Sequence, residues 1–365
     1  MMIGQTLGLY ICRRFTRTIL SVFGLFFAIV YLGDFLELFR RTAERPDFTP
    51  AKAALASLMR VPQICELVMP FAVLFGAIWA FMTLSRTLEL VVARAAGISV
   101  WQFSAPALTV ALTAGVIATT IYNPLGIYLK DQADQLTVDM FAHETRFSSG
   151  SSPSATWIRQ DGVDGESIMH ANETLNQGTR LLQVTAMTFD RNGQFLQRID
   201  AAEADYANGS WTLSNGTIHE AKRSPQTFAT LSIATYLTAD QIKNALASPD
   251  SVPFWQLPGF IETSQAAGLP AFSYQLQYQL LLARPLLFAA MVLIAAAVSL
   301  RVFRFGNIGP RILSGAVAGF VLYVVGEIAR GLGSVGIVPP TLAAWAPAVV
   351  ASLMGFTILL YQEDG

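Results

Sequence analysis

Six apolar stretches constrain the fold of this chain more than any other feature of its sequence. About 20 apolar residues are needed to cross roughly 30 Å of bilayer hydrocarbon as a helix. Each stretch is therefore predicted to be a membrane helix. The composition agrees, because 53% hydrophobic and 13% charged residues exclude a single soluble domain, a basic nucleic-acid-binding protein and a disordered tail protein. The stretches are Thr18–Phe39, Val61–Leu84, Val100–Ile121, Leu280–Leu300, Ile312–Leu332 and Thr341–Tyr361.

Basic residues predict the orientation of these helices. Arg13, Arg14 and Arg17 precede the first apolar stretch, which places the N-terminus, and after six spans the C-terminus, in the cytoplasm. The first stretch is too long for a signal peptide and lacks a cleavage site of small residues, so it is expected to remain as a helix. The cytoplasmic side would then carry eight basic residues: Arg13, Arg14, Arg17, Arg86, Arg94, Arg301, Arg304 and Arg311. Seven others fall at the outer ends of the spans, and this unusual number needs a reason. They are Arg40, Arg41, Arg45, Lys52, Arg60, Arg284 and Arg330.

Residues 130–275 break the membrane pattern and are predicted to form an inserted external domain. They contain 9 basic and 16 acidic residues, whereas the rest of the chain contains 15 and 9. Short alternating segments are separated by turn dipeptides such as Asp161-Gly162 and Asn208-Gly209, which is typical of antiparallel hairpins. The expected fold class is a membrane α-helical protein with an antiparallel β-sandwich or jelly-roll-like domain. The expected parts are residues 1–129 with three membrane helices, the β domain at 130–275, and residues 276–365 with three more.

Motifs for hydrolysis or cofactor chemistry are missing from the sequence. The three histidines form no zinc-protease pattern, no lysine follows a glycine as a phosphate-binding loop requires, and no nucleophile elbow is present. Cys12 and Cys65 fall at or within spans, where packing is the expected role. The chain is therefore expected to bind no metal or cofactor and to have no ATPase site. Any energised work would need another polypeptide that uses ATP and Mg²⁺.

A short amphipathic segment at residues 85–97 separates the second and third spans. Ser85 could cap a helix there and Gly97 could end it. Leu88, Val91, Val92 and Ala95 would form its apolar face, with Arg86, Glu89 and Arg94 elsewhere on its surface. The segment could be an interfacial helix on the lipid. Alternatively, it is a coupling helix that enters a cleft of a cytoplasmic ATPase, with Glu89 as its polar anchor.

Several segments along almost the whole chain resemble the lipopolysaccharide export permeases. LELVVARAAGIS at 88–99 is similar to the coupling helix of that family. Other matches are LGLYICRRFTRTIL at 7–20, DFLELFRR at 34–41, YLTADQI at 236–242 and GFVLYVVGEIARGLGSVGIVPP at 319–340. The order of three helices, a β domain and three helices is also similar. SVPFWQLPGFI at 251–261 resembles the G-type more than the F-type permease.

This resemblance implies a half-transporter in the bacterial inner membrane. It would pair with the homologous F-type permease, two copies of a cytoplasmic ATPase and a single-span periplasmic accessory protein. The complex would extract lipopolysaccharide and pass it through periplasmic β-jelly-roll domains to a bridge toward the outer membrane. In this family the first and fifth helices of the paired subunits form lateral gates.

Candidate substrate contacts follow from the chemistry of a phosphorylated glycolipid. Arginines form strong hydrogen bonds with phosphate, and large apolar side chains suit acyl chains. The candidates are Arg40, Arg41, Arg45, Arg284 and Arg330, with Phe320 and Tyr323 on the fifth span. The arginines could instead snorkel or pair with acids, as Glu37 with Arg41 and Glu327 with Arg330.

Acids within or near the spans are candidate cavity, gate or interface residues, because ionisable groups there usually face a cavity or a partner. They are Asp34, Glu37, Glu66 and Glu327. The position of Asp34 carries a lysine in some members of the resembled family, so neighbouring arginines, a bridging cation or a different head group would have to compensate. The alternative function is a non-transporting membrane scaffold or receptor that uses its β domain to bind an envelope partner.

Overall fold

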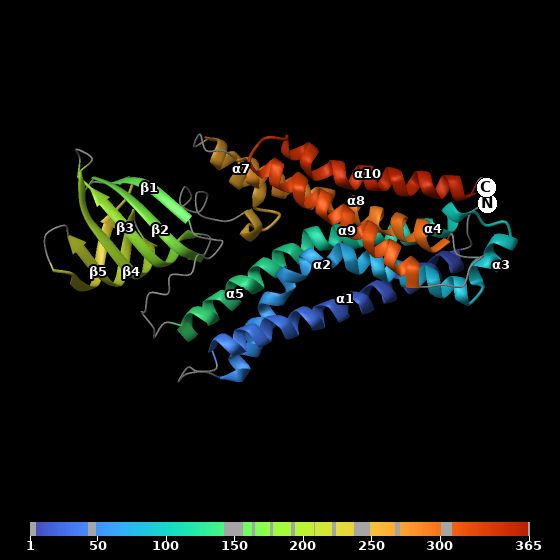
Figure 1. Ribbon diagram of the computed structural model, residues 1–365, viewed down its shortest axis with the longest axis horizontal. Coiled ribbons are helices and arrows are strands. Elements are labelled where there is room, and N and C mark those ends of the chain that lie inside the picture. The colour runs from blue at the N-terminus through green and yellow to red at the C-terminus, as the bar shows by residue number, and fades with distance from the viewer. Residues whose placement is uncertain are drawn as a thin grey trace. The chain divides into compact units, whose positions relative to one another are not determined.

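The computed structural model describes most of the chain in two compact units (Figure 1). The first unit comprises Met1–Arg45, Ala53–Lys130 and Phe272–Gly365, and the second comprises Pro46–Lys52 and Asp131–Ala271. The described residues are 5–42, 49–141, 156–162, 165–175, 178–190, 194–207, 209–220, 224–236, 249–266, 271–300 and 309–363.

Helices make up the first unit, although the start of α2 and the end of α5 belong to the second. They are α1 (Gln5–Thr42), α2 (Pro50–Arg86), α3 (Glu89–Ala95), α4 (Val100–Ile117), α5 (Asn123–Phe141), α8 (Phe272–Leu300), α9 (Gly309–Ser334) and α10 (Pro340–Glu363). In the described part of the chain, six helical segments are long and apolar enough to cross a membrane: Thr6–Arg40, Pro50–Arg86, Val100–Leu136, Phe272–Ser299, Ile312–Ser334 and Pro340–Tyr361. The prediction of six membrane helices is confirmed.

The helices extend beyond the apolar stretches that predicted them. The 37 residues of α2 correspond to a helix about 55 Å long, whereas the hydrocarbon is about 30 Å thick. In the third span, the Ser99 hydroxyl caps α4 by accepting a hydrogen bond from the backbone N–H of Gln102. The Gln102 side-chain oxygen in turn accepts one from the backbone N–H of Ser99, and the two bonds form a capping box. A π-helical turn at Ala118–Tyr122 then joins α4 to α5.

The helical core is centred on α2 and α8. Of the most apolar 18-residue window in each helix, 56% is buried in α2 and 61% in α8, against 6% in α1 and 11% in α9. Small residues allow close approaches: a Cβ on Gly115 of α4 would lie 2.4 Å from Pro285 Cα of α8. The first and fifth spans are thus the least covered by the rest of the chain.

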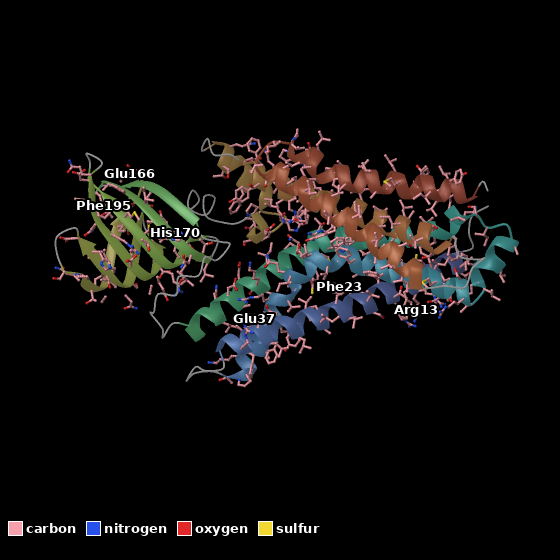
Figure 2. The ribbon with its side chains drawn as sticks, viewed as in Figure 1. Arg13, Phe23, Glu37, Glu166, His170 and Phe195 are labelled. Atoms are coloured by element: carbon pink, nitrogen blue, oxygen red, sulfur yellow. The ribbon has the colours of Figure 1, made fainter. Side chains whose placement is uncertain are left out.

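The second unit contains a six-stranded antiparallel sheet in sequential order. Its strands are β1 (Thr156–Gly162), β2 (Gly165–Leu175), β3 (Arg180–Phe189), β4 (Phe195–Ala207), β5 (Ser210–Glu220) and β6 (Gln226–Ala234). The unit also contains a 3₁₀ turn at Pro249–Ser251 and α7 (Leu257–Ala266). Figure 2 shows His170 and Glu166 on β2 and Phe195 at the start of β4.

The sheet curls until its first and last strands approach each other. The Trp211 indole of β5 donates a hydrogen bond to Gln160 Oε1 of β1 at 3.0 Å, and both side chains are buried. A Cβ on Gly162 of β1 would lie 2.2 Å from the carbonyl oxygen of Ala234 on β6. The buried side is apolar and includes Met169, Leu181, Ile199 and Leu213. The prediction of an antiparallel β domain inserted between membrane helices is confirmed.

A crease across β3, β4 and β5 produces part of this curl. Gln183 and Asn215 have positive φ values of 50° and 54°, which side-chain-bearing residues adopt rarely. In β4 the buried apolar residues are odd-numbered before the crease, at Ile199 and Ala201, and even-numbered after it, at Ala204. Each strand therefore presents odd-numbered side chains to the core on one side of the crease and even-numbered ones on the other.

Candidate functional site

The predicted coupling segment forms a turn and a short helix between α2 and α4. Helix α2 continues to Arg86, Leu88 has a positive φ of 60°, and α3 begins at Glu89. Gly97 has a φ of 80°, as expected of the residue that ends the helix. The expectation that Ser85 caps this helix is wrong, because Ser85 lies in the last turn of α2 with its hydroxyl oxygen buried.

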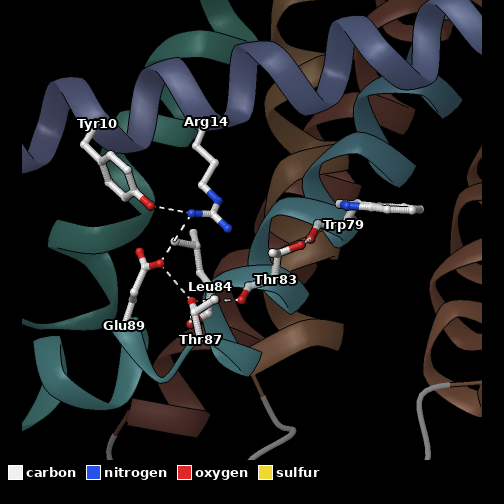
Figure 3. A network of polar contacts seen from close by, with 7 residues as sticks. All are labelled: Tyr10, Arg14, Trp79, Thr83, Leu84, Thr87 and Glu89. Carbon is white, nitrogen blue, oxygen red and sulfur yellow. Dashed lines mark hydrogen bonds and ion pairs between the residues drawn. The ribbon is translucent and has the colours of Figure 1, made fainter.

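Glu89 lies in a polar network that connects α3 with α1 (Figure 3). Its Oε1 lies 3.4 Å from Arg14 Nη1 and accepts a hydrogen bond from Thr87 Oγ1 at 2.8 Å. Arg14 also donates to the Tyr10 hydroxyl, one helical turn earlier on α1. The Arg14 and Glu89 side chains are 24% and 36% exposed. Arg14 is a partner of Glu89 that sequence reasoning missed, since the two residues lie 75 positions apart.

The apolar face of the coupling segment is divided. Leu90 is buried in the helical core, which attaches α3 to the rest of the unit. Leu88 and Val92 are 60% and 66% exposed. Arg86 is also exposed, while the Arg94 side chain lies outside the described residues. The segment therefore presents apolar side chains and an acid together at the surface.

Of the five candidate arginines, the three with described side chains, Arg40, Arg284 and Arg330, lie on three different helices. Arg40 is exposed near the C-terminal end of α1. The Arg41 side chain and the whole of Arg45 lie outside the described residues. Arg330 Nε of α9 lies 3.6 Å from Glu327 Oε1 in an i,i+3 pair, and both side chains are about 40% exposed. Substrate contact by these arginines stays a prediction.

Arg284 and Glu66 form a buried ion pair between α8 and α2. Arg284 Nη2 lies 2.9 Å from Glu66 Oε2, and the side chains are 16% and 12% exposed. The amide nitrogen of Asn123 donates to both Glu66 oxygens at 3.0 and 3.2 Å. This cluster joins three helices, because Asn123 is the first residue of α5 after the π-helical turn. Asn123 was not predicted, because its contact with Glu66 joins residues 57 positions apart in the sequence.

The remaining candidates lie on the two least covered spans. Asp34 of α1 is half-buried, and its Oδ2 is buried without a hydrogen-bond partner in the described part of the chain. Glu37, also on α1, is exposed (Figure 2). On α9, Phe320 is 58% exposed. The Tyr323 ring packs on Phe71 of α2 at 5.6 Å, so it contributes to packing within the chain.

Six helices that can cross a membrane and an antiparallel β domain inserted between them define a multi-pass membrane protein with an inserted β domain. The chain belongs to the family described as lipopolysaccharide export system permease LptF/LptG, whose profile matches residues 9–361. The protein is thus a multi-pass inner-membrane permease of lipopolysaccharide export.

Two relatives carry the name lipopolysaccharide export system permease protein LptG. The protein from Haemophilus influenzae is 24% identical over 368 residues, which cover 99% of each chain. That from Escherichia coli K12 is 23% identical over 361 residues, covering 97% of this chain and 98% of the relative. The expected likeness to the G-type permease is confirmed.

Proposed function

We propose that this permease is one half of an ATP-driven complex that extracts lipopolysaccharide from the inner membrane and delivers it to a periplasmic bridge. Its partners would be a homologous F-type permease, two copies of a cytoplasmic ATPase and a single-span accessory protein. ATP and Mg²⁺ would be used by the ATPase. Both termini would be cytoplasmic and the β domain periplasmic.

The low coverage of α1 and α9 carries this proposal. Only 6% and 11% of their most apolar windows are buried, although both are as hydrophobic as the other spans. Large apolar side chains remain exposed along both, including Leu25, Leu32 and Leu36 on α1 and Val317, Phe320 and Ile328 on α9. A second permease placed against these helices would enclose an apolar cavity suited to acyl chains.

Charged groups near the ends of these spans would meet the head group. Arg40, Arg41, Arg45 and Arg330 are proposed to contact phosphate, since guanidinium and phosphate form strong charge-assisted hydrogen bonds. Arg284 could join them only if its pair with Glu66 opened, because that carboxylate neutralises it. Asp34, Glu37 and Glu327 would lie along the gates, where the unpartnered oxygen of Asp34 could receive a cation or a donor from the partner permease.

The turn before α3, together with α3 itself, is the proposed docking element for the ATPase. Leu88 and Val92 present apolar surface, and Arg86 and Glu89 supply polar contacts beside it. Exposed apolar side chains around a central charged anchor are typical of a contact that a partner protein covers. Arg94 is proposed as a further contact of this element.

The experiment is co-purification of the complete complex with Glu89→Ala. We expect the variant to insert into the membrane normally but to lose the ATPase, and with it lipopolysaccharide release. Glu262→Ala on α7 is the matched control, because it removes another accessible carboxylate. Normal ATPase binding and release by Glu89→Ala would contradict the docking role. A wild-type chain that captures only an envelope protein through its β domain would favour the scaffold function.

A further inference from the structure

Helix α1 is packed most deeply against its own chain near its N-terminal end. Ile11 and Phe15 are fully buried and Ile19 is 7% exposed. Between residues 20 and 37 of α1, no residue is buried. Figure 2 marks Arg13, Phe23 and Glu37 along the helix, and Phe23 still packs against the buried cluster that contains Phe15. Beyond Ile19 the packing is sparser but does not stop: the Phe23 ring lies 6.0 Å from that of Tyr122, the Phe26 ring 6.3 Å from that of Phe75, and Leu38 is 5% exposed.

That attachment includes the elements that flank the coupling turn, and also α4, where Cys12 Sγ lies 3.6 Å from the carbonyl oxygen of Pro106. The Phe15 ring meets Phe81 of α2 edge to face, with 4.8 Å between ring centroids. Phe15, Leu84 at the end of α2 and Leu90 of α3 belong to the same buried cluster. A displacement of α3 would thus reach the base of α1 through packed side chains.

One polar contact connects α3 with α1 directly. Arg14 lies between the two fully buried anchors and extends toward the turn, where its guanidinium lies near Glu89 Oε1 (Figure 3). Thr87 donates to the same oxygen, and both contacts described for Glu89 use Oε1. The Tyr10 hydroxyl accepts from Arg14 and fixes the direction of the guanidinium. The carboxylate can therefore keep its Arg14 contact while Oε2 meets a donor from outside the chain.

We infer that Arg14 is a positioning residue that transmits movement of the coupling turn to α1, so that ATPase motion at Glu89 rotates the first membrane helix about its N-terminal attachment. This inference rests on the proposed function. The helix would rotate about the packed contacts of Phe15. The contact between Arg14 and Glu89 would make the N-terminal end of α1 follow the movement of α3. Because α1 is 38 residues long, about 57 Å as a helix, a small rotation at the base moves its far end substantially.

The test measures coupling in the complete complex reconstituted in lipid. ATP hydrolysis and lipopolysaccharide release are recorded for Arg14→Gln, Arg14→Lys and Arg13→Gln. Arg13→Gln is the matched control, because it removes the same charge from an exposed neighbouring position on the same helix. The readout is lipid released per ATP hydrolysed. A fraction of misfolded complex lowers both rates together and leaves this ratio unchanged.

We expect Arg14→Gln to retain the ATPase and its hydrolysis but to lower the release ratio by about fivefold or more, the size of a typical allosteric coupling. Arg14→Lys should keep most of the wild-type ratio, since it keeps the charge, and Arg13→Gln all of it. An unchanged ratio in Arg14→Gln would overturn the inference. Loss of the ATPase from Arg14→Gln would also overturn it, because Arg14 would then serve docking. Failure of the proposed function gives a different result, since the wild-type chain would bind no ATPase.

Discussion

Glu66 illustrates how a single residue in a membrane span obtains its partners. A charge in the bilayer is costly unless it is paired and hydrogen-bonded. The Glu66 carboxylate is paired with the guanidinium of Arg284 and accepts hydrogen bonds from the side-chain amide of Asn123. The sequence identified Glu66 and Arg284 as unusual, but it assigned Arg284 to the substrate. Their pairing depends on α2 and α8 lying side by side, and no local pattern records that.

Removing the carboxylate alone is predicted to destabilise the protein. Glu66→Leu would leave Arg284 buried without its counter-charge, and breaking a buried pair in this way typically costs about 3–5 kcal/mol. The apparent melting temperature of the purified chain in detergent should fall by several degrees.

The double variant Glu66→Leu/Arg284→Leu is the control for that prediction. It also removes the acceptor of Asn123, so the difference between the two variants isolates the unpaired guanidinium. Because replacing both members of a buried pair by apolar residues is often nearly neutral, the double variant should recover most of the loss. Equal melting temperatures for the single and double variants would contradict a cost of the unpaired guanidinium.

At the scale of elements, a glycine determines how closely α1 and α2 cross. A Cβ on Gly76 of α2 would lie 2.6 Å from Ile19 Cα of α1, and backbone atoms cannot move aside as a flexible side chain can. Ile19 belongs to the attached part of α1. The crossing therefore fixes the base of the helix that the proposed mechanism moves.

Gly76→Ala is predicted to push α1 away from α2 and to lower stability by about 1–3 kcal/mol, as overpacking of a core typically does. Gly24→Ala is the matched control on α1, because a Cβ there would meet nothing within 4 Å. Alanine suits a helix interior better than glycine, so this control should be neutral or slightly stabilising. Thermal unfolding of both variants in detergent measures the difference, and equal effects would contradict the close crossing.

The β strands show what period-two patterns can and cannot predict. Turn dipeptides and alternation indicated an antiparallel domain, and six antiparallel strands are present in the described part. The crease at Gln183 and Asn215 reverses which side chains face the core within single strands. A prediction that continues one alternating pattern across the crease therefore assigns the residues on one side of it to the wrong face of the sheet. The sequence gives no sign of the positive φ at Gln183, because glutamine does not favour that conformation.

At the scale of the whole molecule, the uncovered faces of α1 and α9 are predicted to meet the second permease or the lipid substrate. A photo-crosslinking residue placed at Leu32 or at Val321 should capture the F-type permease or lipopolysaccharide in the assembled complex. Leu353 on α10 is the control, because it is 60% exposed, close to the 56% and 54% of the other two. Mass analysis of the products identifies the captured molecule. Capture of the permease from Leu353 but not from Leu32 or Val321 would place the partner on the other face.

The sequence by itself determined the six membrane helices, the position of the β domain and the family. These depend on local properties: the length of apolar runs, the alternation between turns and a continuous match along the chain. Which charges are paired and which helices remain uncovered became visible only in the folded arrangement of the helices. Arg284 was placed with Glu66, and Arg14 with Glu89, by helix packing across 218 and 75 positions. Such contacts depend on where helices cross in space, and the hydrophobicity that forms each helix does not specify that.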